Sequence, residues 1–201
     1  MLLTILTRTF FGRPAGLVRC ISSISASSGA EVVQHILVAE ESPSSCGQSL
    51  VNLRYAIPRI RGEYVMLLDD DDFVADGSFF LRLSEHVHAN HKPPVVIVKM
   101  DMGDDRVLPE QFGGEPVCGH IACSCYIVRK DIFVKYIESF RNSYDGDFWF
   151  IKDVWDGGEQ FTYLPIVATR VGEVSHGKHE NSNMSAVFVK AGSSQPMPRD
   201  D

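Results

Sequence analysis

The stretch that decides the fold is Gly62-Glu63-Tyr64-Val65-Met66-Leu67-Leu68-Asp69-Asp70-Asp71-Asp72. Its apolar run, residues 64–68, predicts a strand buried on both faces. The strand ends in four aspartates, whose like charges raise one another's pKa unless a cation lies nearby. Open α/β sheets bind ligands at the carboxyl ends of their strands. This run therefore predicts a ligand site with a hard divalent ion, Mg²⁺ or Mn²⁺. The alternative is a solvated acidic loop that caps the next helix through Asp72 or Asp76.

Strand-then-helix units repeat on both sides of this stretch. Strands are predicted over residues 2–6, 32–39, 64–68, 95–100, 121–128, 160–164 and 166–174. Apolar residues at helical spacing predict helices over about 14–24, 50–60, 80–87, 132–140 and 147–157. Gly62 is predicted to end the second helix. Residues 101–117 are expected to form an irregular loop with a short hairpin. The alternation favours the α/β class, with a mostly parallel central sheet flanked by helices.

Composition excludes several classes of protein. The 201 residues include 19 basic and 26 acidic side chains, a net charge of −7, which disfavours binding to nucleic acid phosphates. No apolar run approaches the roughly 20 residues of a membrane span, and the N-terminus lacks the pattern of a signal peptide. Neither the P-loop nor the dinucleotide-binding glycine motif occurs. The cysteines are odd in number and match neither a disulfide framework nor a zinc site, which favours reduced thiols in a cytoplasmic protein. They are Cys20, Cys46, Cys118, Cys123 and Cys125.

Three segments together resemble the inverting GT-A glycosyltransferases, in particular the large family two group. They are Thr7-Arg8-Thr9 after the first strand, Gly62-Glu63-Tyr64, and Leu68 to Asp72, which contains the DxD motif. The resemblance covers about residues 2–178. It implies a GT-A fold in one domain over 1–190, with a nucleotide-sugar-binding half over 1–100, an acceptor-side half over 101–190 and a mobile tail over 191–201.

The resemblance also implies a reaction and a set of site residues. The reaction is transfer of a sugar from a nucleotide-diphosphate-sugar, a UDP-sugar by analogy, to a hydroxyl of a saccharide or other acceptor. Asp71 would hold the metal, Mn²⁺ or Mg²⁺, with Asp69 and His176 as further ligands, and Lys178 would neutralise the leaving diphosphate. The residues expected at the nucleotide are Thr7, Arg8, Thr9, Glu40, Arg54, Asp69 and Asp70. Glu40 stands where the family has an aspartate, and Arg54 where it often has an asparagine.

A transferase of this kind needs a base for the acceptor hydroxyl, and a carboxylate at the start of a helix suits that task. By resemblance Asp147 is the base, with Gly146 in place of the family's glutamate. Asp147 as a helix N-cap is the alternative, and Asp145 is the reserve candidate for the base. Trp149, beside the proposed base, is the candidate for stacking on the acceptor.

Two other functions stay open at this point. A nucleotidyltransferase also uses carboxylate-bound Mg²⁺ on an α/β sheet, but residues 12–16 match its glycine-rich loop poorly. The third possible function is a non-catalytic module that binds nucleotide-sugars, and it is favoured by the presence of Gly146 where the family has a glutamate. His86, His88 and His91 receive no role, since they fit the end of a helix. Cys123 and Cys125 alternate on a predicted strand and are interpreted as small buried residues.

Overall fold

The computed structural model describes residues 1–10, 14–40, 46–141, 143 and 145–172. The strands are β1 (Leu3–Phe10), β2 (Val33–Glu40), β3 (Tyr64–Leu67), β4 (Asp72–Val74), β5 (Val95–Asp101), β6 (Val107–Leu108), β7 (Tyr126–Arg129) and β8 (Phe161–Val171). The α-helices are α1 (Pro14–Ala26), α2 (Cys46–Ala56), α3 (Phe79–Ala89), α4 (Lys130–Tyr136) and α5 (Gly146–Asp156). Short 3₁₀ helices are η1 (Ala30–Val32), η2 (Ile57–Arg59), η3 (Cys123–Cys125) and η4 (Ile137–Ser139). The α/β class predicted from the sequence is confirmed.

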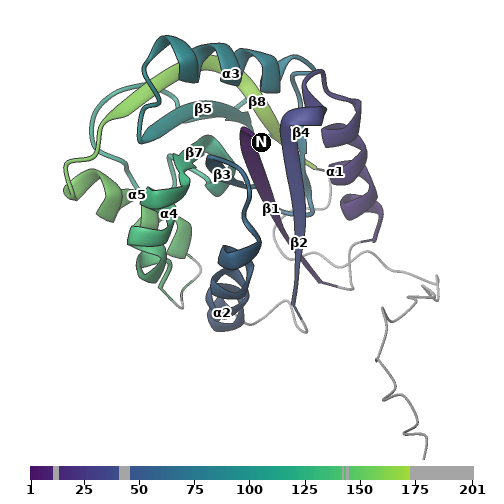
Figure 1. Cartoon of the computed structure of the whole chain (residues 1–201), viewed down its shortest axis with the longest axis horizontal. Helices are drawn as coiled ribbons and strands as arrows, with labels where there is room; N and C mark the ends of the chain where they lie inside the picture. Colours follow the sequence, from purple (N-terminus) through teal and green to yellow (C-terminus); the bar gives the residue numbers. More distant parts are fainter. Residues whose placement is uncertain (11–13, 41–45, 142, 144, 173–201) are drawn as a thin grey trace, which may run out of the picture.

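All eight strands form one sheet in the order β2-β1-β3-β7-β5-β8-β4, with β6 paired to β5. Strands β2, β1 and β3 are parallel, and so are β5 and β8. Strand β7 is antiparallel to both β3 and β5, so it joins the two parallel groups into a mixed sheet. Figure 1 shows the curled sheet with helices on both sides.

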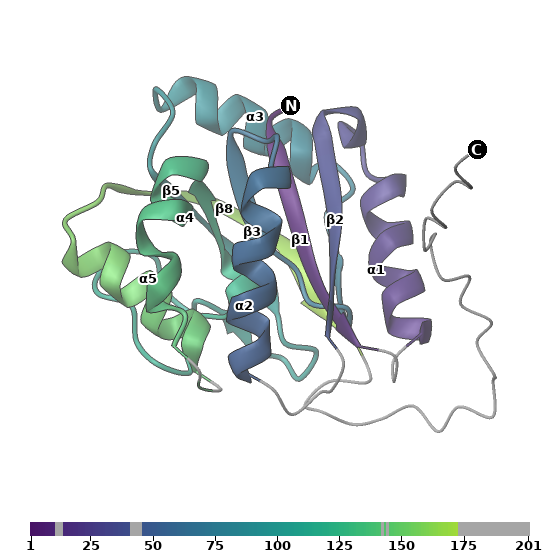
Figure 2. The same cartoon turned by 60° about the horizontal axis from the view of Figure 1, so that its bottom comes forward.

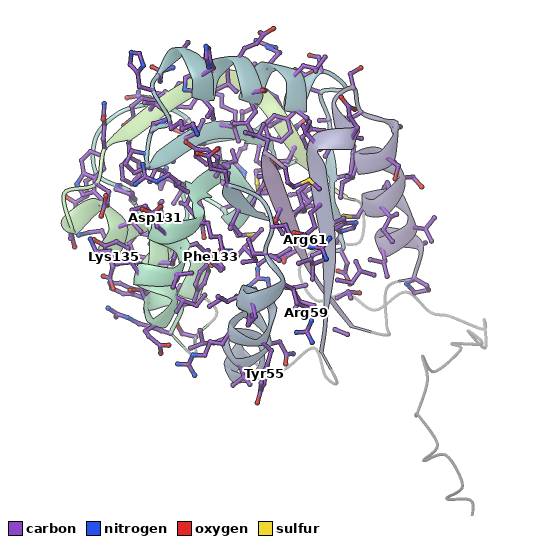
Figure 3. All side chains as sticks on the ribbon, in the orientation of Figure 1. Tyr55, Arg59, Arg61, Asp131, Phe133 and Lys135 are labelled. Atoms are coloured by element: carbon purple, nitrogen blue, oxygen red, sulfur yellow. The ribbon has the colours of Figure 1, made fainter. Side chains whose placement is uncertain are left out.

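Each face of the sheet buries its own apolar cluster. On one face, α1 and α3 pack through Cys20, Ile24, Phe80 and neighbouring residues against the outward side chains of β1, β3 and β5. On the other face, α2, α4 and α5 cover Leu6, Val65 and Ile97. Helix α4 illustrates the amphipathic pattern: Phe133 is buried, whereas Asp131 and Lys135 lie on its outer side (Figure 3). Among the described residues, no helix has both the length and the apolar character that a membrane span requires.

Gly62 has a different role from the predicted helix end. Helix α2 ends at Ala56, and η2 follows it before Gly62 is reached. A Cβ at position 62 would lie 2.4 Å from the backbone nitrogen of Thr4. The Gly62 amide also donates a 2.8 Å hydrogen bond to the hydroxyl of Thr4. Glycine is needed here because β1 passes so closely, and the contact fixes the start of β3 beside β1.

Three predicted strands differ from the structure. The prediction of a strand over 121–128 is wrong for its first part, because residues 123–125 form η3 and β7 begins at Tyr126. Strand β6 pairs with Met100 and Asp101, so it occupies the edge of β5 that a longer β7 would need. The two short strands predicted around residue 165 are one strand, β8. Its pairing with β5 shifts register between Ile97 and Lys99, and this irregularity accommodates Pro165.

Strands β1, β2 and β3 end at the same side of the sheet, called the carboxyl edge below. In Figure 2 the ends of β1 and β2 lie together, and α1 begins beside them. The acidic run follows β3 at this edge, and η3 enters the sheet there because β7 runs in the opposite direction. The carboxyl edge therefore gathers side chains from the first, middle and last parts of the described chain.

Candidate active site at the carboxyl edge

The pairing of β1 with β3 places Arg8 beside the acidic run. The backbone pairing between the two segments continues beyond the end of β3. The amide of Leu68 donates to the Leu6 carbonyl at 3.1 Å, and the amide of Asp70 donates to the Arg8 carbonyl at 3.2 Å. Asp69 lies between these two bonds, and its carboxylate meets the Arg8 side chain. Local backbone pairing thus builds the first element of the site.

Arg8 and Asp69 form a bidentate ion pair. Nε and Nη2 of Arg8 donate to Oδ1 and Oδ2 of Asp69, each at 2.7 Å. Their side chains are 23% and 27% exposed, so the pair is partly shielded and still reachable from solvent. Paired N–H donors in this geometry fix orientation as well as charge. Arg8 thus places a positive charge beside the acidic run, where the sequence analysis predicted a divalent metal ion.

The four aspartates alternate between solvent and the interior. Asp69 and Asp71 are half-buried, whereas Asp70 and Asp72 are buried. Asp72 lies in β4, and the cap position of α3 is Ser78, whose amide donates to Asp76 at 2.8 Å. The run is therefore no helix cap, although Asp76 does support the start of α3. The spacing of Asp69 and Asp71 leaves two carboxylates at the surface of the edge.

Backbone contacts hold the acidic run from two sides. A Cβ at Gly16, in the first turn of α1, would lie 2.8 Å from the Asp70 carbonyl oxygen. Glycine therefore lets the N-terminus of α1 approach the aspartates, and the positive end of the helix dipole favours their charge. On the other side, the amide of Gly172 donates to the Asp71 carbonyl at 2.6 Å, so the end of β8 meets the run.

Helix α5 brings Asp147 to the same edge. Burial raises the pKa of the Asp147 carboxyl; the positive charge of Arg8 opposes this shift, and the negative charge of Asp69 adds to it. A raised pKa suits a group that must accept a proton near neutral pH. The cap position of α5 is Asp145, so Asp147 is not the N-cap. Asp145, the reserve candidate for the base, accepts a 2.7 Å hydrogen bond from the indole of Trp149 in the same helix.

Two residues of the site were missed by the sequence analysis. The Sγ atom of Cys123 lies 3.6 Å from Nη2 of Arg8 and 3.7 Å from Oδ2 of Asp69. The hydroxyl of Tyr126 donates to the Asp147 carbonyl at 3.1 Å and so ties the start of α5 to β7. Both residues are buried, and burial was predicted for Cys123. Their position at the carboxyl edge depends on the direction of β7, which no local sequence pattern reveals.

The described residues fit a metal ion only in part. Among residues 1–172, apart from the gaps given above, no group of three or more His, Cys, Asp or Glu side chains could hold a metal. Arg8 holds both oxygens of Asp69. Asp71 is half-buried at the edge, and a hard cation in a nucleotide site needs only one or two protein carboxylates, since water and phosphate fill its shell.

The structure places the other predicted site residues at different distances from the Arg8–Asp69 pair. Arg54 pairs with Glu138 of η4 through two hydrogen bonds and is not brought to the Arg8–Asp69 pair. The Thr7 hydroxyl is buried against His35, at 2.8 Å, and Thr9 is also buried. Trp149 lies near Asp147 on α5, with the Arg141 guanidinium 3.9 Å from its ring centre. The backbone of Glu40 ends β2 at the edge, but its side chain, like His176 and Lys178, is outside the described part of the chain.

The mixed, curled sheet with helices on both faces is an α/β fold of the GT-A type. No family model matches the chain, and no curated protein does either. The solved structures that resemble it include Staphylococcus aureus TarS, a glycosyltransferase, with a TM-score of 0.66 and 12% identity. That match covers 86% of this chain and 37% of TarS.

A shorter TarS structure, residues 1–349 in complex with UDP-GlcNAc, is similar with a TM-score of 0.60 and 13% identity, over 94% of this chain and 62% of that one. A197 from STIV is similar with a TM-score of 0.54 and 10% identity, over 82% of each chain. The chain thus spans less than two thirds of the TarS structures. The predicted GT-A fold is confirmed by these similarities.

Proposed function

We propose that this protein is a metal-dependent, inverting glycosyltransferase of the hexosyltransferase type that takes its sugar from a UDP-sugar. The observation that carries the proposal is that the Arg8–Asp69 ion pair and the Asp147 carboxyl lie at the carboxyl edge of a GT-A fold, near enough for the charges of Arg8 and Asp69 to shift the pKa of Asp147. The resemblance to TarS, which is solved with UDP and with UDP-GlcNAc, supports the choice of donor. The acceptor is a hydroxyl of a saccharide or other molecule.

In the proposed reaction, Asp147 removes the proton from the acceptor hydroxyl as its oxygen attacks the anomeric carbon. The bond from that carbon to the diphosphate breaks on the opposite face, and the nucleoside diphosphate leaves. Burial raises the pKa of the Asp147 carboxyl, which makes it a stronger base, and the Tyr126 hydroxyl donates to the Asp147 carbonyl and positions the start of α5. Trp149, two residues after Asp147 on α5, is proposed to contact the acceptor.

On the donor side, Asp71 would hold Mn²⁺ or Mg²⁺, with Asp69 and His176 as the further proposed ligands. When bound, the ion would screen the charge of the diphosphate. Arg8 and Lys178 are proposed to add positive charge as the leaving group develops. Gly172, the last described residue, lies against Asp71, and His176 follows it by four residues in the sequence.

The test is a thermal-shift series with UDP, GDP, CDP and TDP, each with and without Mn²⁺. A ligand at 100 times its Kd stabilises by about 2.7 kcal/mol, which is about 5–10 °C in a domain of this size. We expect a Mn²⁺-dependent shift with UDP that is lost in Asp71→Asn. Asp147→Asn should keep that shift and lose sugar transfer. An absence of any nucleotide shift contradicts the proposal, whereas transfer that survives in Asp147→Asn contradicts the assignment of the base.

A further inference from the structure

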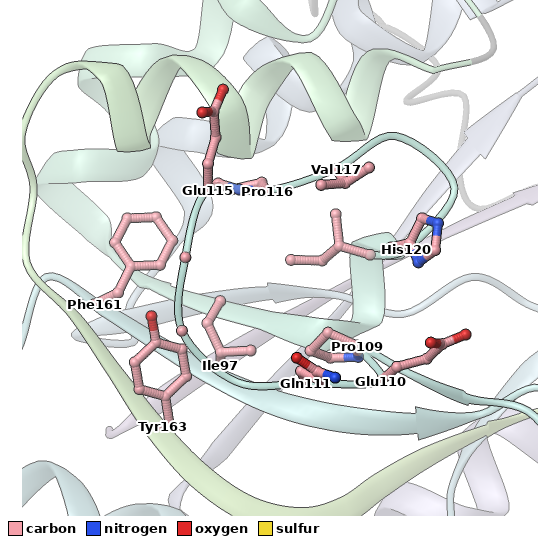
Figure 4. Close-up of a pocket in the computed structure, with 13 residues that line it drawn as sticks. Ile97, Pro109, Glu110, Gln111, Glu115, Pro116, Val117, His120, Phe161 and Tyr163 are labelled. Carbon is pink, nitrogen blue, oxygen red and sulfur yellow. The ribbon is translucent and has the colours of Figure 1, made fainter.

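A cavity of about 270 Å³ lies beside the candidate site and takes no part in the chemistry described so far. Its floor is Ile97 of β5 together with Phe161 and Tyr163 of β8 (Figure 4). Its roof is the loop of residues 109–121, which arches over the sheet. We call this cavity the loop pocket.

The roof of the loop pocket is fastened at several points. Glu115 pairs with Lys152 of α5 at 3.1 Å. The ring of Phe112 contacts that of Tyr163, with 5.4 Å between centroids, and Nζ of Lys99 lies 5.2 Å from the Phe112 ring centre. These contacts join the loop to α5, β5 and β8. The pocket is therefore a built feature of the fold.

One end of the loop pocket lies at the carboxyl edge. The loop leaves β6, whose Leu108 pairs with Met100 near the end of β5. It returns at Ile121, two residues before Cys123, so the Cα atoms of these two residues lie within about 7 Å of each other. Cys123 in turn contacts Arg8 and Asp69. The other end is Phe161, which pairs with Val95 at the start of β5, away from the edge.

The lining of the loop pocket changes along this direction. Glu110, Gln111 and His120 are exposed around the end near the edge. Deeper, the walls are aromatic and aliphatic, with the Tyr163 hydroxyl as the polar side-chain group. Sugar hydroxyls packed against Ile97, Phe161 and Val117 would find no partner on those side chains, and unpaired buried polar groups are costly. An aromatic ring would pack on Phe161 and Tyr163 in the offset geometries that aromatic pairs prefer. The carboxylate of Glu110 disfavours a phosphate-bearing occupant, whereas that of Glu115 is paired with Lys152.

We propose that the loop pocket binds the aryl group of an acceptor whose hydroxyl lies at the carboxyl edge, so that the acceptor is an aryl-bearing, uncharged hydroxyl compound. This inference rests on the proposed function, because it names the acceptor class for the same site. It places specificity for the acceptor in residues 109–121 and β8, outside the nucleotide side of the sheet. The polar mouth takes the hydroxyl-bearing part, and the apolar interior takes the ring.

The probes that test it are phenyl β-D-glucoside and methyl β-D-glucoside, titrated into the whole chain without any donor. Burial of the phenyl ring should make the first bind at least about tenfold more tightly. Val117 lines the pocket and is 56% exposed, so Val117→Trp fills the cavity without disturbing the core. The matched control is Val134→Trp on α4, where the valine is 42% exposed and outside the pocket.

We expect Val117→Trp to abolish the preference for the phenyl compound and Val134→Trp to retain it. The UDP thermal shift, run on all three proteins, reports separately on the proposed function. Equal affinity for the two glucosides, or a phenyl preference that survives in Val117→Trp, overturns the loop-pocket proposal even when UDP binds. A phenyl preference without any nucleotide shift overturns the acceptor assignment together with the proposed function.

Discussion

Replacing Arg8 by methionine should destabilise the protein, because it leaves the carboxylate of Asp69 unpaired among neighbouring aspartates. Exposed ion pairs contribute about 0.2–1 kcal/mol, whereas removal of one partner of a buried pair costs about 3–5 kcal/mol. With side-chain exposures of 23% and 27% and two bonds of 2.7 Å, the Arg8–Asp69 pair lies between these limits. We expect a loss of about 2 kcal/mol, which lowers Tm by about 4–8 °C.

The assay is thermal and urea unfolding of Arg8→Met, with two comparisons. Arg106→Met breaks a pair with Asp104 at the same 2.7 Å distance, but its side chains are 55% and 53% exposed, so no measurable change is expected. The double variant Arg8→Met with Asp69→Asn should recover most of the stability, since the cost comes from the unpaired charge. If Arg8→Met and Arg106→Met behave alike, or if the double variant is no more stable than the single one, the reasoning is refuted.

Three further predictions concern the same edge. Asp147→Asn should abolish transfer. Because the folded Asp147 carboxyl keeps its proton to a higher pH than the unfolded one, this group costs the wild type stability as pH rises from the unfolded value through the raised pKa, so the Tm of Asp147→Asn minus that of the wild type should increase from pH 3 to 8, with a gain of about 1 kcal/mol at the upper end. Gly16→Ala should cost about 1–3 kcal/mol and weaken UDP binding, because its Cβ meets the Asp70 carbonyl, whereas Gly77→Ala, in open space, should leave both Tm and the UDP shift unchanged. Tyr126→Phe should lower kcat with little change in KM for the donor, at a stability cost of about 1 kcal/mol; an unchanged kcat contradicts its positioning of Asp147.

The sequence predicted the features that depend on local pattern. The buried strand over residues 64–68, the acidic run after it and a helix starting near Asp147 were all located from apolar spacing and abrupt changes of polarity, and the structure has β3 and α5 there. The joining of Arg8, Asp69 and Asp147 at one edge followed from the resemblance and from the rule for open α/β sheets. The roles of the individual site residues remain predictions.

What the sequence could not provide depends on contacts between distant parts of the chain. Cys123 was interpreted as a residue on a strand, but β6 takes the edge of β5 and leaves it in η3 beside Arg8. Arg54 was placed at the nucleotide by its position in the chain, whereas its guanidinium is bound to Glu138, which is 84 residues away. Gly62 was predicted to end a helix because glycine is common there, whereas the structure explains the glycine by the close approach of Thr4. No periodicity encodes such pairings.

The antiparallel strand β7 also governs the order in which the sheet can form. Until residue 129 has been synthesised, β2, β1 and β3 can pair, but β5 can pair only with the two-residue β6 at its end, because its other partners are β7 and β8, and β4 pairs with β8. The nascent chain therefore carries the apolar residues 95–99 of β5 without strand partners and an open edge on β3 until β7 is complete, and such strands invite aggregation. A fragment of the first hundred residues should not fold as an independent nucleotide-binding unit, and the two halves of the molecule would have to be produced together.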